Sequence, residues 1–415
     1  MSLMLHLFQG FGIELEYVLV NAATLDVAPQ ADWLLAEAAG DITGEYVSGP
    51  LAWNNELALH VIELKVNGPS PTLVGLDGLF QAELGKVQGL LDRRGLRLMP
   101  TGMHPWMDPE RELRLWPHEN RDVYAAFDRI FSCKGHGWAN LQSMHINLPF
   151  AGDAEFARLH AAIRFLMPLM PALTASSPVM DGALTGIADS RLAVYRHNCA
   201  RIPSVTGAVV PEAIGSIAAY RHQILERIFS DLAPHDPQGI LSEEWVNARG
   251  AIPRFDRMAI EIRVLDMQEC PGMDLAFAQL IVATLRALCA GEWSDLPSLQ
   301  AWPTAHLARY FDATVNSADI TEVHDRRYLA ALGYAGGQAS ALKLWGHLAE
   351  RAAQAGALDP PAEAALEHYL RQGTLSTRIR ASLPAEPERA DLERVYRELC
   401  DCLAEGRPYH TKLRS

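Results

Sequence analysis

The sequence lacks the features typical of membrane-spanning or disulfide-rich proteins. It has no apolar run of 18 residues: the stretch 163–175 contains Pro168 and Pro171, and the stretch 275–290 carries polar residues, so we expect two buried helices. The segment 3–8 is too short for a secretory signal. The six cysteines are scattered and form no CxxC pair. This usage is typical of a reduced, cytoplasmic enzyme.

The sequence also lacks an excess of positive charge. It has 36 basic and 50 acidic side chains, which give a net charge of −14. We therefore expect neither nucleic acid nor an anionic membrane as a partner. No internal repeat or low-complexity linker is present, and the 49% hydrophobic content suffices for a large core. A homodimer is compatible with this composition but is not favoured by it.

The common phosphate-binding and metal-binding motifs are missing as well. Neither Gly85-Lys86 nor Lys134-Gly135 has the spacing of a Walker A loop, and no GxGxxG follows a predicted strand. The zinc motif HExxH and calcium-binding loops are absent. If the protein binds ATP, we expect metal ions and arginines to hold its phosphates.

Three segments, 12–20, 144–148 and 259–265, alternate apolar and polar side chains with the two-residue period of a strand. Their apolar positions are Ile13, Leu15, Tyr17, Met144, Ile146, Leu148, Ile260, Ile262 and Val264. Their polar positions are Glu14, Glu16, His145, Asn147, Glu261 and Arg263. If these strands share one sheet, one face packs a core and the other gathers carboxylates, an imidazole and a guanidinium.

A fourth segment, 55–66, has the same character with a change of register. Glu56 and Glu63 are seven residues apart, and the apolar positions change parity near Val61-Ile62. A β-bulge there would explain the change of parity and bring both glutamates onto one face.

Each motif alone has a commoner explanation: a solvated sheet face, a structural histidine or a surface ion pair. Together they predict a metal site, because clustered carboxylates repel one another unless a cation neutralises them. The predicted ligands for more than one Mg²⁺ or Mn²⁺ are Glu14, Glu16, Glu56, Glu63, His145 and Glu261. We predict that Glu261 and Arg263 are catalytic, with Arg263 stabilising a phosphoryl group during transfer.

The periodicity predicts further elements along the chain. We expect an α+β fold: a main domain over residues 1–290 and a helical extension over 291–415 that packs on it. The expected helices are 29–39, 72–94, 120–131, 153–175 and 211–232, with Asp153 as an N-cap and helices from Gly272 onward. The expected strands are 12–20, 55–66, 96–101, 138–149 and 252–266.

Six motifs in order resemble the glutamate–cysteine ligase type 2 family, or carboxylate–amine ligases, of the glutamine synthetase/guanidino-kinase fold superfamily. The resemblance covers about residues 10–290. It is carried by Phe11-Gly-Ile-Glu-Leu-Glu16, the pair Glu56 and Glu63, Gly102-Met-His-Pro-Trp106, His145-Ile-Asn147, Ala175-Ser-Ser-Pro178 followed by Ser190–Arg196, and Glu261-Ile-Arg-Val-Leu-Asp266.

The resemblance implies a curved, mainly antiparallel sheet wrapped by helices, similar to a glutamine synthetase catalytic domain. It implies that ATP phosphorylates a carboxylate, by default the γ-carboxylate of glutamate, and that an amine, by default cysteine, attacks the acyl phosphate. The alternatives are a phosphotransferase on the same fold and a non-catalytic relative that binds metabolites.

The sequence departs from many relatives at two motif positions and leaves several roles open. Asn147 stands where many relatives have a second histidine, and Met103 stands where the motif has threonine. Substrate or phosphate contacts are predicted for Asn147, Arg191 and Arg196, with helix-surface arginines as the alternative for the latter two. The alternatives for His104, Lys65 and Lys134 are a structural histidine and two solvated lysines.

Overall fold

The computed structural model describes residues 4–411, which are built around one eight-stranded sheet. The strand order is β2-β3-β4-β1-β6-β10-β9, β5 also pairs with β1, and every pairing is antiparallel. The strands are β1 (Gly12–Asn21), β2 (Glu45–Ser48), β3 (Leu51–Asn55), β4 (Val61–Val66), β5 (Leu96–Met99), β6 (Ser143–Pro149), β9 (Ala251–Arg254) and β10 (Ala259–Asp266). Two short hairpins lie outside the sheet: β7 (Val179–Met180) with β8 (Ala183–Leu184), and β11 (Glu322–Val323) with β12 (Ala339–Ser340).

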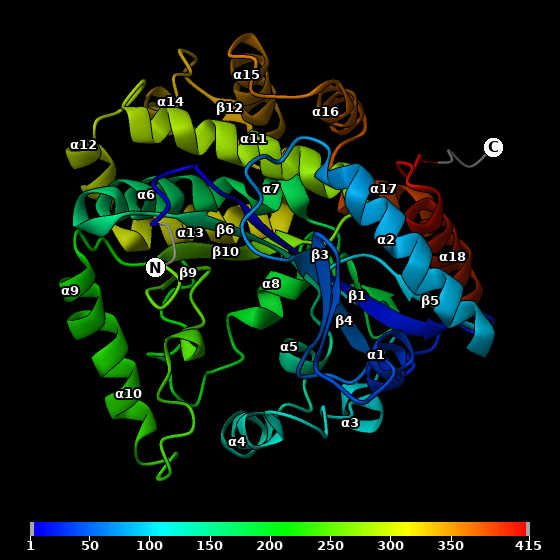
Figure 1. The fold of residues 1–415 in the computed structure, drawn as a ribbon. Coiled ribbons are helices and arrows are strands. Elements are labelled where there is room, and N and C mark those ends of the chain that lie inside the picture. The colour runs from blue at the N-terminus through cyan, green and yellow to red at the C-terminus, as the bar shows by residue number, and fades with distance from the viewer. Residues whose placement is uncertain (1–3, 412–415) are drawn as a thin grey trace.

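Helices surround this sheet, which confirms the predicted α+β class (Figure 1). In the first half of the chain they are α1 (Ala31–Ala39), α2 (Leu76–Leu91), α3 (Pro109–Glu112), α4 (Arg121–Phe131), α5 (His136–Ala139), α6 (Gly152–Leu166), α7 (Pro171–Thr174) and α8 (Ser190–Tyr195). In the second half they are α9 (Ile217–Tyr220), α10 (Glu226–Leu232), α11 (Pro271–Ala290), α12 (Leu296–Gln300), α13 (Thr304–Ser317), α14 (Arg326–Ala331), α15 (Ala341–Gln354), α16 (Pro360–Gln372), α17 (Leu375–Ser382) and α18 (Arg389–Glu405).

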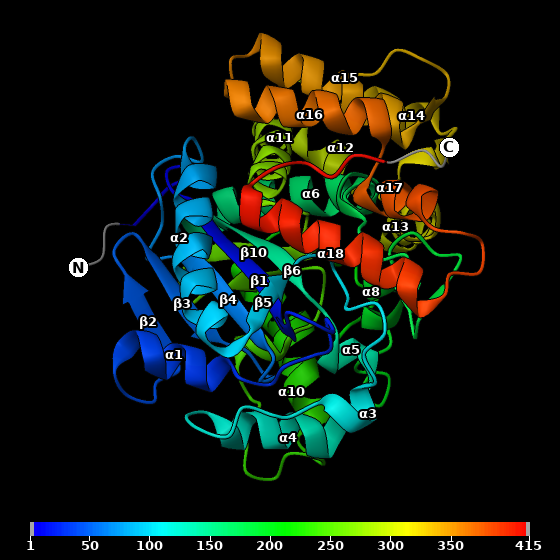
Figure 2. The same ribbon diagram turned by 90° about the vertical axis from the view of Figure 1, so that its right-hand side faces the viewer.

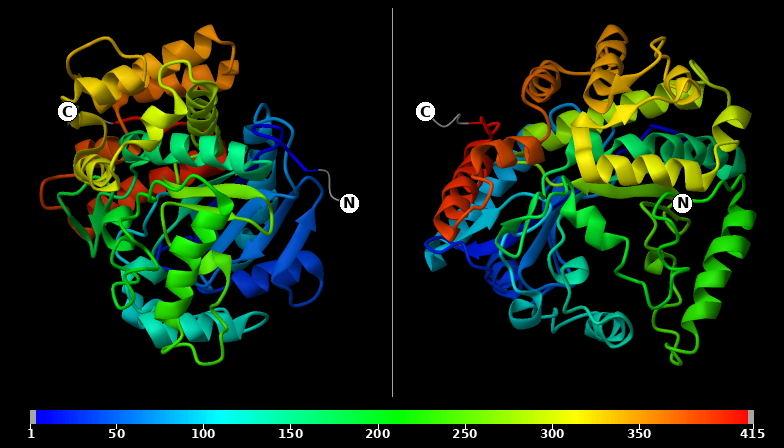
Figure 3. Two further views of the ribbon diagram at one scale, coloured as in Figure 1. Left: turned by 90° about the vertical axis from the view of Figure 1, so that its left-hand side faces the viewer. Right: turned by 180° about the vertical axis from the view of Figure 1, so that it is seen from behind.

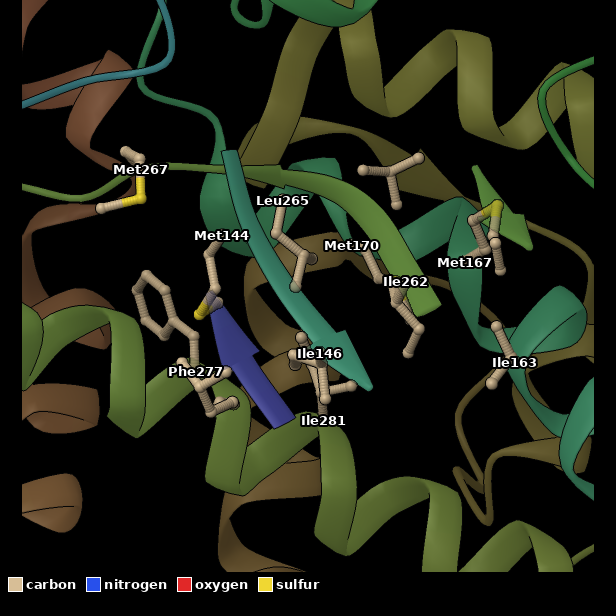
Figure 4. Packing of buried hydrophobic residues seen from close by; sticks show 14 of the residues in the cluster. Met144, Ile146, Ile163, Met167, Met170, Ile262, Leu265, Met267, Phe277 and Ile281 are labelled. Atoms are coloured by element: carbon tan, nitrogen blue, oxygen red, sulfur yellow. The ribbon is translucent and has the colours of Figure 1, made fainter. Parts of the chain in front are cut away.

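The apolar face of the sheet forms the core, as the two-residue period predicts. All nine predicted apolar positions on β1, β6 and β10 are fully buried. Figure 4 shows Met144 and Ile146 of β6 beside Phe277 and Ile281 of α11. Burial of such side chains stabilises the fold by roughly 1.5–3 kcal/mol each.

Helix α11 is the central helix of this core. It is long and apolar enough to cross a membrane, but 72% of its most apolar window is buried inside the protein, where it packs against α2, α6 and α16. This confirms the expected buried helix at residues 275–290. The second expected buried helix, near residue 163, is also confirmed. Pro168 interrupts it, so α6 gives way to a 3₁₀ turn at Met167–Leu169 before α7.

The opposite face of the sheet looks toward a different set of helices. Helices α4, α5 and α8 lie on the side away from α11, and α9 and α10 lie to one side of them, at the left of Figure 1 (Figures 1 and 3). On the remaining side, α18 packs against β5 and α2 (Figure 2). The polar side chains of β1, β6 and β10 therefore face a space that helices cover.

Several predicted boundaries are wrong. The strand expected from residue 138 begins only at Ser143, because 136–139 form α5. The helix expected from residue 211 begins at Ile217, where the Ser216 hydroxyl caps it. The strand expected over 252–266 is a hairpin of β9 and β10, with a turn that contains Met258 at φ 51°.

Two finer predictions are also wrong. Asp153 does not cap α6: the cap is Ala151, and the Asp153 carboxylate accepts a hydrogen bond from the Ile217 amide. There is no bulge at Val61-Ile62, because β4 begins at Val61 and pairs with β1 in regular register. A turn over residues 56–60 connects β3 and β4 instead, and the sheet's register shift lies in β10 between Ile262 and Leu265.

The predicted division at residue 290 coincides with the end of α11. One apolar cluster nevertheless contains residues from Phe11 to Leu403, so the C-terminal helices share their core with the sheet. Apart from the β11–β12 hairpin, the regular elements after Gly272 are helices, as expected. The domain boundary itself stays a prediction.

Candidate active site

The polar face of the sheet lines a cavity of about 390 Å³. The strands contribute Glu14, Glu16, Glu63, Lys65, Ser143, His145, Arg254, Glu261 and Arg263. The turns of the sheet and the segments that cover it contribute Glu56, Leu57, Tyr124, Phe127, Gly137, Trp138, Leu141, Arg191, Tyr195, Asn198, Cys199, Trp245, Val246, Ala248 and Arg257. The cavity thus has an acidic floor and a partly aromatic roof.

Two clusters of ligand atoms lie on this floor. Glu14, Glu63 and His145 place one ligand atom each within 4.8 Å of one another, and so do Glu16, Glu56 and Glu63. Glu63 belongs to both clusters because β4 pairs with β1 so that Glu63 lies opposite Glu16. The turn after β3 brings Glu56 to the same place, so the predicted grouping of these two glutamates is correct although the predicted bulge is not.

Hydrogen bonds hold the floor in place. His145 Nδ1 donates to Glu14 Oε2 at 2.8 Å, and Asn147 Nδ2 donates to Glu14 Oε1 at 3.0 Å. The backbone amide of Ser143 donates to Glu16 Oε2 at 2.6 Å. Neighbouring strands β1 and β6 thereby orient both glutamates of the first motif.

The floor carries more negative charge than its surroundings neutralise. Burial and the charge of Glu16 raise the pKa of Glu56 to about 8, and burial and the charges of Glu14 and Glu56 raise the pKa of Glu63 well above its usual range. Burial alone would lower the pKa of His145, but its hydrogen bond to Glu14 and the nearby carboxylates raise it to about 9. The imidazolium in turn lowers the pKa of Glu14 to about 2 against the effect of burial.

This donor set suits a hard divalent cation. Four of the five residues in the two clusters are carboxylates, and the fifth is an imidazole. A cation between them would favour the ionised forms that burial and repulsion disfavour. The residues present therefore fit Mg²⁺ or Mn²⁺, with Glu63 shared by two ions.

Glu261 lies beside the other predicted metal ligands, with Oε1 3.9 Å from His145 Nδ1, but its nearest partners are arginines. Its carboxylate pairs with Arg263 on one side, and Arg254 Nη1 lies 3.6 Å from Oε2 on the other. Glu261 belongs to neither ligand cluster among the described residues. The described geometry makes Glu261 a partner of two guanidiniums, and its metal-binding role stays a prediction.

Arg263 lies at the register shift of β10, where an extra residue lets the strand change the direction of its side chains. Arg191 also lines the cavity, but its guanidinium is fully buried, pairs with Asp266 and lies 3.4 Å from the Arg263 carbonyl. Arg191 therefore supports the strand segment that carries Arg263.

The other predicted residues fall in three places. Arg196 pairs with Asp312 and is not among the residues that line the cavity, so its predicted substrate contact is not supported. Asn147 acts through Glu14 and borders a separate hollow at the end of the sheet. His104 is buried with Nε2 2.8 Å from the Leu25 carbonyl, which is the structural alternative.

The prediction of a solvated side chain is correct for one of the two lysines and wrong for the other. Lys134 is exposed, as expected of a solvated lysine. Lys65 was expected to be solvated, but it lines the cavity, where its Nζ lies 3.6 Å from Glu63 Oε1.

Several cavity residues were not predicted from the sequence. Arg254 and Arg257 reach the cavity from the β9–β10 hairpin, and the aromatic residues Tyr124, Phe127, Trp138 and Trp245 reach it from the covering segments. The helical period of 120–131 indicates a buried face but not the partner of that face. No local pattern could have identified these side chains, because tertiary packing brings them to the site.

Comparison with known proteins gives a consistent result. The family described as glutamate-cysteine ligase family 2 matches residues 10–398. A protein of Archaeoglobus fulgidus is 36% identical over 278 residues, which are 67% of this chain and 73% of the relative. A Corynebacterium glutamicum protein named "Putative glutamate--cysteine ligase 2" is 27% identical over 338 residues, which are 77% of this chain and 81% of the relative.

Two solved structures share the fold. The glutamate–cysteine ligase of Francisella tularensis, solved in complex with AMP, superposes with a TM-score of 0.62 at 13% identity and covers 97% of this chain and 89% of its own. A bifunctional glutathione synthetase of Pasteurella multocida gives a TM-score of 0.57 at 13% identity, over 96% of this chain and 53% of its own. The chain therefore belongs to glutamate–cysteine ligase family 2 and is an ATP-dependent ligase.

Proposed function

We propose that this enzyme uses ATP to phosphorylate an amino-acid carboxylate and then joins the acyl group to an amine. The family makes the γ-carboxylate of glutamate and the amino group of cysteine the first pair to test. The observation that carries the proposal is the pair of acidic clusters that share Glu63 on the same sheet face as Arg263. Carboxylates are poor electrophiles, and phosphorylation supplies the leaving group that amide formation needs.

In this proposal the acidic floor holds the divalent cations and thereby the phosphates. Glu14, Glu63 and His145 would hold one Mg²⁺ or Mn²⁺, and Glu16, Glu56 and Glu63 the other. Bound ions supply charge neutralisation for the phosphates of ATP. The protein side chains fix where that charge lies before the substrates arrive.

The guanidiniums beside the acidic floor have a separate role in this proposal. Arg263 lies on β10 next to the floor, and its pKa is raised because the Glu261 carboxylate outweighs the effect of burial. A fixed cation of this kind stabilises negative charge that develops on a transferring phosphoryl group. Arg254 has a buried Nε that no described residue accepts a hydrogen bond from, which makes it a second candidate contact for an anionic group of a substrate.

Phosphate release from ATP, measured with glutamate and a panel of amines and with products identified by mass, tests the proposal. The expected result is one amide and one phosphate for each ATP consumed. Transfer of the phosphoryl group to a stable acceptor without amide formation would identify a phosphotransferase instead. Absence of both activities with every carboxylate and amine tested, while the protein is folded, would support a non-catalytic relative.

A further inference from the structure

The roof of the cavity opposite the acidic floor is made largely of aromatic rings. Phe127 lies between Trp138 at 5.0 Å and Trp245 at 5.8 Å, measured between ring centroids. These rings come from α4, α5 and the 3₁₀ turn Glu244–Val246, so three separate segments of the chain build one surface. Leu57, Leu141 and Val246 extend the apolar surface.

Two short segments of the chain connect this roof to residues that contact Arg263. The Trp138 indole donates to the Asn198 carbonyl at 3.2 Å, and Tyr195, which interacts with Arg263, lies three residues before Asn198. From Trp245 the chain runs on to Gly250, whose carbonyl accepts the Arg263 amide at 3.0 Å. The aromatic roof and the proposed phosphoryl-transfer group therefore line the same cavity and are linked by short segments of the chain.

This connection favours the amine over the nucleobase as the ligand of the roof. The attacking amine must reach the acyl carbon that has just received the phosphoryl group, so its substituent must bind next to Arg263. The base of ATP is separated from the transferred phosphorus by the ribose and two phosphates and can bind farther away. A second hollow of about 250 Å³ shares Glu14, Lys65 and Arg257 with the cavity and is otherwise lined mainly by glycine, proline and aliphatic residues. That hollow is a candidate for a separate site for the base.

We infer that the acceptor is an amine with a bulky apolar or aromatic substituent, of the size of phenylalanine or phenethylamine, and that Trp245 and Phe127 select it. A small thiol such as cysteine would leave most of this apolar surface uncovered. The binding free energy of an amine becomes more favourable in proportion to the apolar area that it buries against the roof. This inference rests on the proposed amide ligation and specifies its second substrate.

The test compares two kinds of acceptor, hydroxylamine and larger amines, that can attack the same acyl phosphate. Hydroxylamine has no substituent for the roof to bind and forms a hydroxamate with any activated carboxylate, so it reports phosphorylation alone. The amine panel contains cysteine, alanine, leucine, phenylalanine and phenethylamine, and kcat/KM for each is measured with a fixed carboxylate and saturating ATP. We expect phenylalanine-sized amines to exceed alanine and cysteine by at least about tenfold.

Trp245→Ala is the diagnostic variant, because the Trp245 indole makes no hydrogen bond to another residue in the described range 4–411. We expect it to lower kcat/KM for the large amines by about tenfold or more, and by much more than it lowers kcat/KM for alanine or for hydroxamate formation, while Trp245→Phe retains the preference. Trp33→Ala is the matched control: Trp33 lies under the Arg94 guanidinium and outside the cavity lining. We expect it to change none of these values.

Two results would overturn the inference while the proposed function stands. The first is hydroxamate formation together with a preference for cysteine or alanine over every large amine. The second is a Trp245→Ala variant with a raised KM for ATP and an unchanged KM for the amine, which would assign the roof to the base. If no carboxylate yields a hydroxamate, the proposed function itself fails, and the amine inference fails with it.

Discussion

Arg263 contacts Glu261 from two residues farther along β10, at the register shift between Ile262 and Leu265. The carboxylate lies between this guanidinium and that of Arg254 on the neighbouring strand. The catalytic role proposed for Arg263 therefore requires Glu261 to position its guanidinium. A long, flexible side chain needs a fixed partner to hold its charge in one place.

Replacing Arg263 by alanine should slow the chemical step more than it weakens binding. We expect kcat to fall by roughly 10²–10³ with a small change in KM, because a fixed cation stabilises the transferring group in the transition state. Arg196→Ala is the matched control, since Arg196 pairs with Asp312 away from the cavity lining. Steady-state kinetics check both variants, and an effect of Arg263→Ala on KM alone would remove Arg263 from the catalytic role.

Glu261→Gln separates positioning from metal binding. If Glu261 orients Arg263, we expect turnover to fall by roughly 10–100-fold while the number of bound Mn²⁺ ions is unchanged. Mn²⁺ binding is counted by titration with electron paramagnetic resonance. Loss of one bound ion in this variant would instead restore Glu261 to the metal ligands that the sequence predicted.

Glu63→Gln should affect metal binding more than any other single change on the floor. Glu63 belongs to both ligand clusters, whereas Glu56 belongs to one. We expect Glu63→Gln to weaken both bound Mn²⁺ ions and Glu56→Gln to weaken one, each by about tenfold or more. Equal effects of the two substitutions would contradict a shared ligand.

The metal-free protein should lose stability as the pH rises. The pKa of Glu56 is about 8 in the folded protein and about 4.5 when the chain is unfolded. Between these values the folded state holds a proton that the unfolded state has released, so raising the pH lowers the free energy of unfolding. The raised pKa of His145 acts in the same direction, between its ordinary value near 6.5 and about 9.

Thermal unfolding with a chelator present measures this effect. We expect Tm to fall by roughly 5 °C between pH 5.5 and pH 8. Glu56→Gln should flatten the dependence, and Glu350→Gln, an exposed control, should not. Added Mg²⁺ should raise Tm more at pH 8 than at pH 5.5, because it binds the ionised carboxylates. A Tm that rises with pH in the metal-free protein would contradict the electrostatic description of the floor.

A buried ion pair between α17 and the segment after β10 should matter for stability and not for chemistry. Arg378 and Glu269 are fully buried, and both bind the backbone of Tyr409 near the end of the described chain. Arg378→Met should lower the free energy of unfolding by about 3–5 kcal/mol, because it leaves the Glu269 carboxylate buried without its cationic partner. Chemical denaturation measures this value. Arg371→Met, which breaks an exposed pair with Glu367, should cost at most about 0.5 kcal/mol.

The sequence predicted which side of the sheet each residue faces more accurately than it predicted the path of the chain between the strands. Alternation along β1, β6 and β10 reports which side each residue faces, and that rule needs no knowledge of the rest of the fold. It placed Glu14, Glu16 and His145 correctly. It could not locate the turn at residues 56–60 or the register shift in β10, because neither has a local sequence signature.

The covering side of the site was not predictable in the same way. Arg254, Trp138 and Trp245 reach the cavity only because distant segments pack over the sheet. Arg196 shows the converse: its neighbourhood in the sequence suggested a substrate contact, but Asp312, which is 116 residues away, pairs with it. Both outcomes are decided by tertiary contacts that periodicity does not encode.

The most direct test of the central claim follows oxygen from the carboxylate to phosphate. The enzyme is given ATP, Mg²⁺, an amine and a carboxylate substrate labelled with ¹⁸O, and the inorganic phosphate is analysed by mass spectrometry. Formation of an acyl phosphate predicts one ¹⁸O atom in each phosphate released during amide synthesis. Unlabelled phosphate, or label in AMP, would contradict the account.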